Sequence, residues 1–205
     1  REVVIENPNR IADWCEKKCI RLIVDESFVD FSEGWEHNTL LSDKILETYP
    51  HMLVMKSISK SYGVPGIRLG ILCSADVDII SRIKKMVSIW NLNSFCEFFM
   101  QIYTKYEKDY KKACNKFIEE RNDFEAKLRT IGFLRVIPSQ ANYFLCEVTD
   151  RYTATELTQL LLKRYNILIK DCGTKSAFAG KQYIRIATRD RADNAYFVEA
   201  LKELV

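Results

Sequence analysis

Short apolar runs alternate with amphipathic stretches over the first half of the chain. The apolar runs predict buried strands at residues 3–5, 20–25, 51–57 and 69–73. The amphipathic stretches repeat an apolar residue every three or four positions, which predicts helices at residues 11–18, 40–47 and 76–88. Strands that alternate with helices are typical of a mostly parallel sheet with helices on both faces. We therefore expect an α/β fold for this half.

The second half of the chain has a different order of elements. One long helix, free of Gly and Pro, is predicted from about residue 94 to residue 129. It is followed by strands predicted at 133–137, 142–148, 167–170 and 183–187, and by helices predicted at 154–165 and 191–204. This order predicts a smaller α+β domain. We place the domain boundary inside the long helix, with residues 1–105 in the first domain and residues 106–205 in the second.

The composition excludes several classes of protein. Hydrophobic residues make up 47% of the chain and charged residues 29%, a balance that excludes a disordered chain. The net charge of +3 is too small to indicate binding to nucleic acid or to a membrane surface. No apolar run is long enough to span a membrane, and the first residues contain no apolar segment of a secretory signal.

The cysteines and histidines bear on location and on metal binding. Seven cysteines, an odd number scattered through apolar stretches, are typical of free thiols in a reducing compartment, so we expect a cytoplasmic protein. Cys15 and Cys19 are spaced to share one helix face, but neither of the two histidines, His37 and His51, completes a zinc-ligand set. We expect buried, apolar cysteines and no metal site.

Three polar features lie on the predicted strands or at their ends, where open α/β sheets place ligand sites. Residues 25–31 bring acids directly after a buried strand, and residues 56–70 bring hydroxyls, a lysine and an arginine into a loop rich in Gly and Pro. In the second domain, Arg185 lies within a predicted strand, where we expect it to be buried. Each feature alone has an ordinary explanation, since an acid after a strand is often a turn residue.

Together, the first two features suit a phosphorylated cofactor. Hydroxyls and an arginine provide the several donors and the forked cation that a phosphate binds. A lysine beside them can form a Schiff base once its amine is neutral, and an acid at a neighbouring strand end can pair with a protonated pyridine nitrogen. These are the groups that pyridoxal 5'-phosphate (PLP) requires. The glycine motifs of nucleotide-binding and dinucleotide-binding loops are absent.

The same residues resemble a known family. Ser57-x-Ser59-Lys60 followed by Gly66-x-Arg68-x-Gly70 resembles the lysine signature of class I/II aminotransferases of PLP fold type I. Residues 25–28, Asp-Glu-Ser-Phe, resemble that family's Asp-Glu-Ala-Tyr motif. The last forty residues are similar to those of histidinol-phosphate aminotransferases and threonine-phosphate decarboxylases. The resemblance covers residues 1–205 and implies the C-terminal part of a PLP-binding large domain followed by a small domain.

The resemblance implies roles for individual residues. Lys60 would hold PLP as a Schiff base and then transfer a proton, and Asp25 would keep the pyridine nitrogen protonated. The other residues that it places at the cofactor are Asn9, Phe28, Ser57, Ser59 and Arg68, the last three at the phosphate. Arg185 would bind the substrate carboxylate, and Asn142 would lie near it.

The chain departs from the family pattern at two places. Phe28 stands where many members have a tyrosine whose hydroxyl contacts the ring oxygen, so this chain lacks that hydrogen bond. A phenylalanine here resembles the threonine-phosphate decarboxylase branch. The family's Asn-Pro-x-Asn-Pro-Thr-Gly turn begins at Asn7 but breaks off after Asn9, where Arg10 follows. Either that turn is deleted or residues are missing between Asn9 and Arg10, and we favour the second explanation.

The leading prediction is a PLP-dependent aminotransferase, a cytoplasmic homodimer that acts on an amino acid or phosphorylated amino acid with a 2-oxo acid. Two alternatives remain open: a decarboxylase of the threonine-phosphate type, and a catalytically incomplete fragment. The length of 205 residues is short for this family, so we expect the cofactor lysine to be present without much of the surrounding site.

Overall fold

The chain forms two compact units, Arg1–Tyr110 and Lys111–Val205, and the long helix α6 (Ser94–Leu128) contributes to both. The computed structural model describes residues 8–173, 175, 178 and 180–205. The predicted strand at residues 3–5 lies outside these residues. Both units combine sheets with helices, so the α/β prediction is confirmed.

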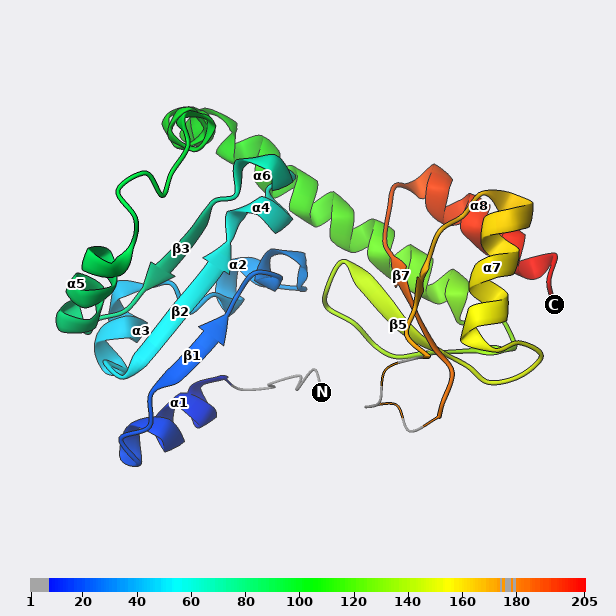
Figure 1. The fold of residues 1–205 in the computed structure, drawn as a ribbon, viewed down its shortest axis with the longest axis horizontal. Helices are drawn as coiled ribbons and strands as arrows, with labels where there is room; N and C mark the ends of the chain where they lie inside the picture. Colours follow the sequence, from blue (N-terminus) through cyan, green and yellow to red (C-terminus); the bar gives the residue numbers. More distant parts are fainter. Residues whose placement is uncertain (1–7, 174, 176–177, 179) are drawn as a thin grey trace. The chain divides into compact units, whose positions relative to one another are not determined.

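The first unit contains a three-stranded sheet in the order β1-β2-β3 (Figure 1). Its strands are β1 (Leu22–Asp25), β2 (Met52–Ser57) and β3 (Gly70–Cys73). Its helices, besides the first part of α6, are α1 (Pro8–Lys17), α2 (Trp35–Asn38), α3 (Asp43–Thr48), α4 (Ile58–Ser61) and α5 (Val77–Met86), with 3₁₀ turns η1 (Val29–Phe31) and η2 (Pro65–Ile67).

The strands of the first unit do not all run in one direction. β1 and β2 are parallel, whereas β3 is antiparallel to β2, with Gly70 opposite Ser57. Neighbouring parallel strands need a crossover connection, usually a full helix. Residues 58–69 provide only the one-turn α4 and η2, so the chain turns back beside β2. The turn places this loop at the same sheet edge as the end of β1.

Most elements of the first unit lie where the apolar pattern predicts them. The predicted helix at 40–47 begins later, at Asp43, because the Ser42 hydroxyl caps it by accepting a hydrogen bond from the N–H of Ile45. The four-residue α2 was not predicted, since one turn is too short to show a helical period. α1 begins at Pro8 and continues through Asn9 and Arg10, so no turn separates these two residues.

The second unit is built on a four-stranded antiparallel sheet in the order β4-β5-β7-β6. Its strands are β4 (Leu134–Val136), β5 (Tyr143–Val148), β6 (Lys170–Asp171) and β7 (Tyr183–Ala187), and its helices are α7 (Ala154–Tyr165) and α8 (Arg191–Lys202). β6 is shorter than predicted, because Asn166 ends α7 in a left-handed conformation and residues 167–169 approach the sheet without pairing.

One apolar core fills the second unit. The inner face of the sheet packs against the end of α6, α7 and α8, through residues such as Phe124, Phe144, Leu157, Ile184 and Leu201. No helix in the described part of the chain is long and apolar enough to cross a membrane. The seven cysteines all lie in the described part, and none of them forms a disulfide.

Candidate active site

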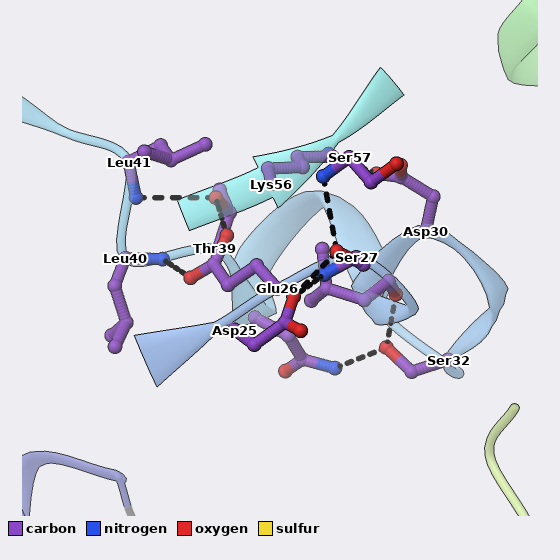
Figure 2. A network of polar contacts seen from close by, with 12 residues as sticks. Asp25, Glu26, Ser27, Asp30, Ser32, Thr39, Leu40, Leu41, Lys56 and Ser57 are labelled. Carbon is purple, nitrogen blue, oxygen red and sulfur yellow. Dashed lines mark hydrogen bonds and ion pairs between the residues drawn. The ribbon is translucent and has the colours of Figure 1, made fainter. Parts of the chain in front are cut away.

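Two segments meet at the carboxyl ends of the parallel strands β1 and β2. The first, the acidic turn, comprises residues 25–28, and the second, the lysine loop, comprises residues 57–69. The N–H of Glu26 donates a hydrogen bond to the carbonyl of Met55, 2.8 Å away. The N–H of Ser57 donates to the hydroxyl of Ser27 at 3.0 Å, as Figure 2 shows. These bonds hold the acidic turn against the start of the lysine loop.

Asp25 ends β1 with its carboxylate at the surface. Its Oδ1 accepts hydrogen bonds from the N–H of Ser27 at 2.9 Å and from the Ser27 hydroxyl at 2.5 Å. Its Oδ2 has no hydrogen-bond partner among the described residues. Burial by itself raises the pKa of the Asp25 carboxyl, but the bonds from Ser27 and the positive charge of Lys60 outweigh that effect, so the pKa is below its usual value. Asp25 is therefore ionised at neutral pH and has one oxygen available for a donor.

Glu26, next to Asp25, has a different role. Its side chain is buried, and its two oxygens accept from the Thr39 hydroxyl at 2.8 Å and from the N–H of Leu40 at 2.5 Å (Figure 2). Because both of its oxygens are occupied, Glu26 has a structural role and joins the acidic turn to residues 39 and 40. Of the two neighbouring acids, Asp25 is therefore the one available to a ligand.

Two lysines four residues apart occupy opposite environments. Lys60, on α4, is exposed, and its Nζ lies 4.3 Å from the centroid of the Phe28 ring. Lys60 has no hydrogen bond or ion pair to any described residue. Lys56, on β2, is buried, and its Nζ lies 2.6 Å from Oδ1 of the buried Asp30. Only Lys60 therefore presents a free amine beside the acidic turn.

The three residues expected at the cofactor phosphate differ in what they present. Arg68 is exposed, and its backbone is left-handed (φ 56°), a conformation uncommon for residues other than glycine. The half-buried Ser57 has no hydrogen-bond partner for its hydroxyl among the described residues. The hydroxyl of Ser59 is buried and bridges the backbone of Leu69, accepting from its N–H at 3.1 Å. Ser59 thus joins α4 to the residue that follows Arg68, and its hydroxyl is already used. Arg68 and Ser57 present the more accessible donors.

The two residues expected at the substrate carboxylate lie in the second unit. Arg185 is exposed on β7, and the expectation that it is buried is wrong. Strand residues alternate between faces, and Ile184 and Ile186 occupy the core face, which turns Arg185 outward. Its guanidinium lies 5.1 Å from the ring of Tyr143. Asn142, just before β5, accepts a hydrogen bond through its carbonyl from the N–H of Thr188.

Asn9, the remaining expected cofactor residue, lies in the first turn of α1, and its side chain falls outside the described part of the structure. The structure also reveals residues that the sequence reading missed. Lys56 and Asp30 form the buried ion pair, and Lys170 lies directly opposite Arg185 in the pairing of β6 with β7. A lysine at an inward position of a buried strand was the available signal for the first pair, because a buried charge requires a partner.

These residues fit PLP. The free amine of Lys60 suits the cofactor aldehyde, the free oxygen of Asp25 suits a protonated ring nitrogen, and Arg68 with Ser57 suits the phosphate. Lys56 does not fit, since its amine is committed to Asp30. All the groups that match the cofactor belong to the first unit.

Comparison with known proteins agrees with this fit. Residues 6–201 match the family model for aminotransferase class I and II. The chain is 33% identical over 203 residues to CMP-5'-(3-aminopropyl)phosphonate synthase of Streptomyces rubellomurinus, covering 99% of this chain and 32% of the relative. It is 32% identical over 188 residues to L-serine phosphate decarboxylase of Sulfurospirillum multivorans, covering 90% of this chain and 47% of the relative.

A solved structure extends the comparison to the fold. Histidinol-phosphate aminotransferase from Clostridium acetobutylicum superimposes with a TM-score of 0.80 at 26% identity, over 96% of this chain and 57% of that one. The chain thus spans 32%, 47% and 57% of the length of these three proteins. The predicted family and cofactor are confirmed: the chain belongs to the class I and II aminotransferase family of PLP-dependent enzymes.

Proposed function

We propose that the chain provides the cofactor lysine of a PLP-dependent enzyme that removes the carboxyl group of a phosphorylated amino acid. The observation that carries this proposal is the free amine of Lys60 beside the ionised Asp25, while the only neighbouring lysine on β2 is committed to an ion pair. Lys60 would bind the cofactor covalently and then hold and deliver the proton at the substrate's α-carbon.

Asp25 and the phosphate ligands would fix the cofactor in place. When bound, PLP supplies a ring that withdraws electrons from the substrate's α-carbon. Asp25, whose pKa is low, would stay ionised and hold a proton on the ring nitrogen through its free Oδ2. Arg68 and Ser57 would bind the phosphate, while Ser59 keeps the lysine loop closed through Leu69.

The type of reaction is the finer part of the proposal. The sequence favoured transamination, and the family model and the histidinol-phosphate aminotransferase structure support it as the second candidate. Decarboxylation is supported by relatives named L-serine phosphate decarboxylase and threonine-phosphate decarboxylase, the second 30% identical over 197 residues. Phe28 supports it as well, because the ring beside Lys60 carries no hydroxyl to bond the cofactor.

The charges on the second unit support a substrate with two anionic groups. Lys170 and Arg185 are directly opposed, exposed, and without an ion-pair partner among the described residues. Like charges opposite each other destabilise a sheet unless an anion lies between them. The acid on the same side of β5, Glu147, is already paired with Arg135 and Lys181. We assign the α-carboxylate to Arg185, with Asn142 near it, and a phosphate or phosphonate to Lys170.

We further propose that the enzyme is a homodimer in a reducing compartment such as the cytoplasm. The compartment is supported by the seven free cysteines. The dimer is supported by an exposed apolar segment between the end of α5 and the start of α6, formed by Met86, Ile89, Trp90, Phe95 and Phe98. A cluster of large exposed apolar side chains is typical of a surface that another protein covers.

A product assay on the full-length protein tests the reaction. With PLP and O-phospho-L-serine, we expect carbon dioxide to be released although no 2-oxo acid is added. We expect little turnover of L-serine, and no turnover of O-phospho-L-serine by Lys60→Ala. If added 2-oxoglutarate accepts the amino group and no carbon dioxide is released, the enzyme is an aminotransferase and the decarboxylase proposal is wrong. Equal turnover of L-serine would contradict the phosphate assignment.

A further inference from the structure

We propose that the buried ion pair of Lys56 and Asp30 is a positioning device that holds Lys60 against the acidic turn and thereby sets its reactivity toward the cofactor aldehyde. This inference rests on the proposed function of Lys60. Neither Lys56 nor Asp30 touches the groups that would bind the cofactor, so both are positioning residues.

The ion pair is short and enclosed. Nζ of Lys56 lies 2.6 Å from Oδ1 of Asp30, and both side chains are buried. Figure 2 shows Lys56 at the end of β2 and Asp30 just beyond the acidic turn. The ring of Tyr62 lies 5.8 Å from the Lys56 amine, and Oδ2 of Asp30 is buried without a hydrogen-bond partner among the described residues. The pair is therefore not fully satisfied.

Stability alone does not explain such a pair. Removing two charges from water costs much of what their attraction returns, and apolar residues of similar volume often stabilise a protein as well or better. A charged hydrogen bond, unlike an apolar contact, fixes both the distance and the direction between two segments. We therefore attribute the pair to the position that it fixes.

That position is the one on which Lys60 depends. Lys56 comes directly before the lysine loop, and Asp30 comes two residues after Phe28 at the end of the acidic turn. The same two segments are joined by the bond from Ser57 to Ser27 and by the contact of Lys60 with Phe28. Of these contacts the ion pair is the one between two buried charged side chains. Without it, only the backbone bonds of Glu26 and Ser57 would join the acidic turn to β2 and the lysine loop in the described part of the chain, and we expect the position of Lys60 relative to Asp25 to be held less firmly.

Chemical trapping measures this position directly. The full-length protein is incubated with PLP, reduced with borohydride, and the modified fraction of each lysine is read by peptide mass spectrometry. Exposed Lys84 and Lys163 are internal references. In the double variant Lys56→Met with Asp30→Leu, we expect trapping at Lys60 to fall about tenfold or more, because small displacements of a reacting group cost large factors in rate. The references should not change.

Three further proteins separate position from stability. Lys56→Arg should keep trapping at Lys60 near the wild-type level, because a guanidinium can bind both oxygens of Asp30. Arg21→Met removes the exposed ion pair of Arg21 with Asp76 and should leave Lys60 trapping unchanged. Lys56→Met with Asp30→Asn removes both charges with little change of shape at residue 30, so no unpaired buried charge is left. We expect the same loss of trapping at Lys60 in this variant. It takes the place of Lys56→Met with Asp30→Leu if circular dichroism shows that the latter does not fold.

The outcomes distinguish this inference from the proposed function. Normal trapping at Lys60 in a folded variant without the pair would overturn the inference and leave the function standing. Loss of trapping in that variant, with no product from any phosphorylated amino acid in the wild type, would support the inference and reject the reaction. Trapping at Lys60 of the wild type no higher than at Lys84 would overturn both.

Discussion

The two compact units are held together in different ways. In the second unit, twenty buried apolar residues form a single core between the sheet and helices α6, α7 and α8. In the described part of the first unit, buried apolar residues form two separate clusters, one of four residues and one of three. Buried polar residues gather instead around the acidic turn and the lysine loop, namely Glu26, Ser27, Asp30, Lys56 and Ser59. We infer that apolar burial maintains the second unit, whereas hydrogen bonds and one ion pair maintain the site in the first.

The largest effect is expected from a change in the core of the second unit. Phe144 is fully buried and contacts Phe124, with the ring centroids 6.0 Å apart. Phe144→Ala should lower the free energy of unfolding by about 3–5 kcal/mol, because it removes buried apolar area and leaves a cavity. Urea denaturation followed by circular dichroism measures the change.

Leu168→Ala is the matched control in the same unit, since Leu168 is 76% exposed. It should change the free energy of unfolding by less than about 0.5 kcal/mol. Similar costs for the two substitutions would show that the second unit does not depend on its core in the way described.

A smaller effect, on assembly rather than folding, is expected in the first unit. Trp90 is 91% exposed in the apolar segment before α6. Trp90→Asp should shift the protein from dimer to monomer, because it places a charge in the proposed apolar interface. Sedimentation velocity measures the shift. The control is Val77→Ser, which changes an exposed apolar residue at the start of α5, outside the proposed interface, and should leave the dimer intact. A monomeric wild-type protein would rule out the proposed interface.

The smallest effect concerns Asp25 and acid. Its pKa is lower in the folded chain than in the unfolded one, so the ionised carboxylate stabilises the fold above its unfolded pKa, and this contribution disappears as the pH falls through the folded pKa. Asp25→Asn lacks the contribution. The difference in the free energy of unfolding between wild type and Asp25→Asn should therefore shrink below about pH 4. A difference that stays constant during acid titration would contradict the role given to Ser27 and Lys60.

Much of the fold follows from local patterns in the sequence. Apolar runs located the strands within a few residues, and capping residues explain where the helices begin, as Ser42 does for α3. Because adjacent parallel strands end at one edge, the sequence also indicated that Asp25 and the lysine loop would be neighbours. The antiparallel direction of β3 did not follow, since it depends on how tightly residues 58–69 turn.

The details of the site depend on contacts that no local pattern contains. The partner of Lys56 is Asp30, 26 positions earlier in the chain, and the sequence gives no distance between them. Lys170 faces Arg185 only because of the register between β6 and β7. Arg185 was expected to be buried because it lies within a predicted strand, although alternation along that strand directs its side chain to the opposite face from Ile184 and Ile186.

The central claim is that Lys60, and not Lys56, is the cofactor lysine. Peptide mapping of the wild-type full-length protein after reduction with borohydride in the presence of PLP tests it most directly. We predict the mass of the reduced cofactor on Lys60 and an unmodified Lys56. Cofactor bound to Lys56, or to no lysine of this chain, would contradict the account.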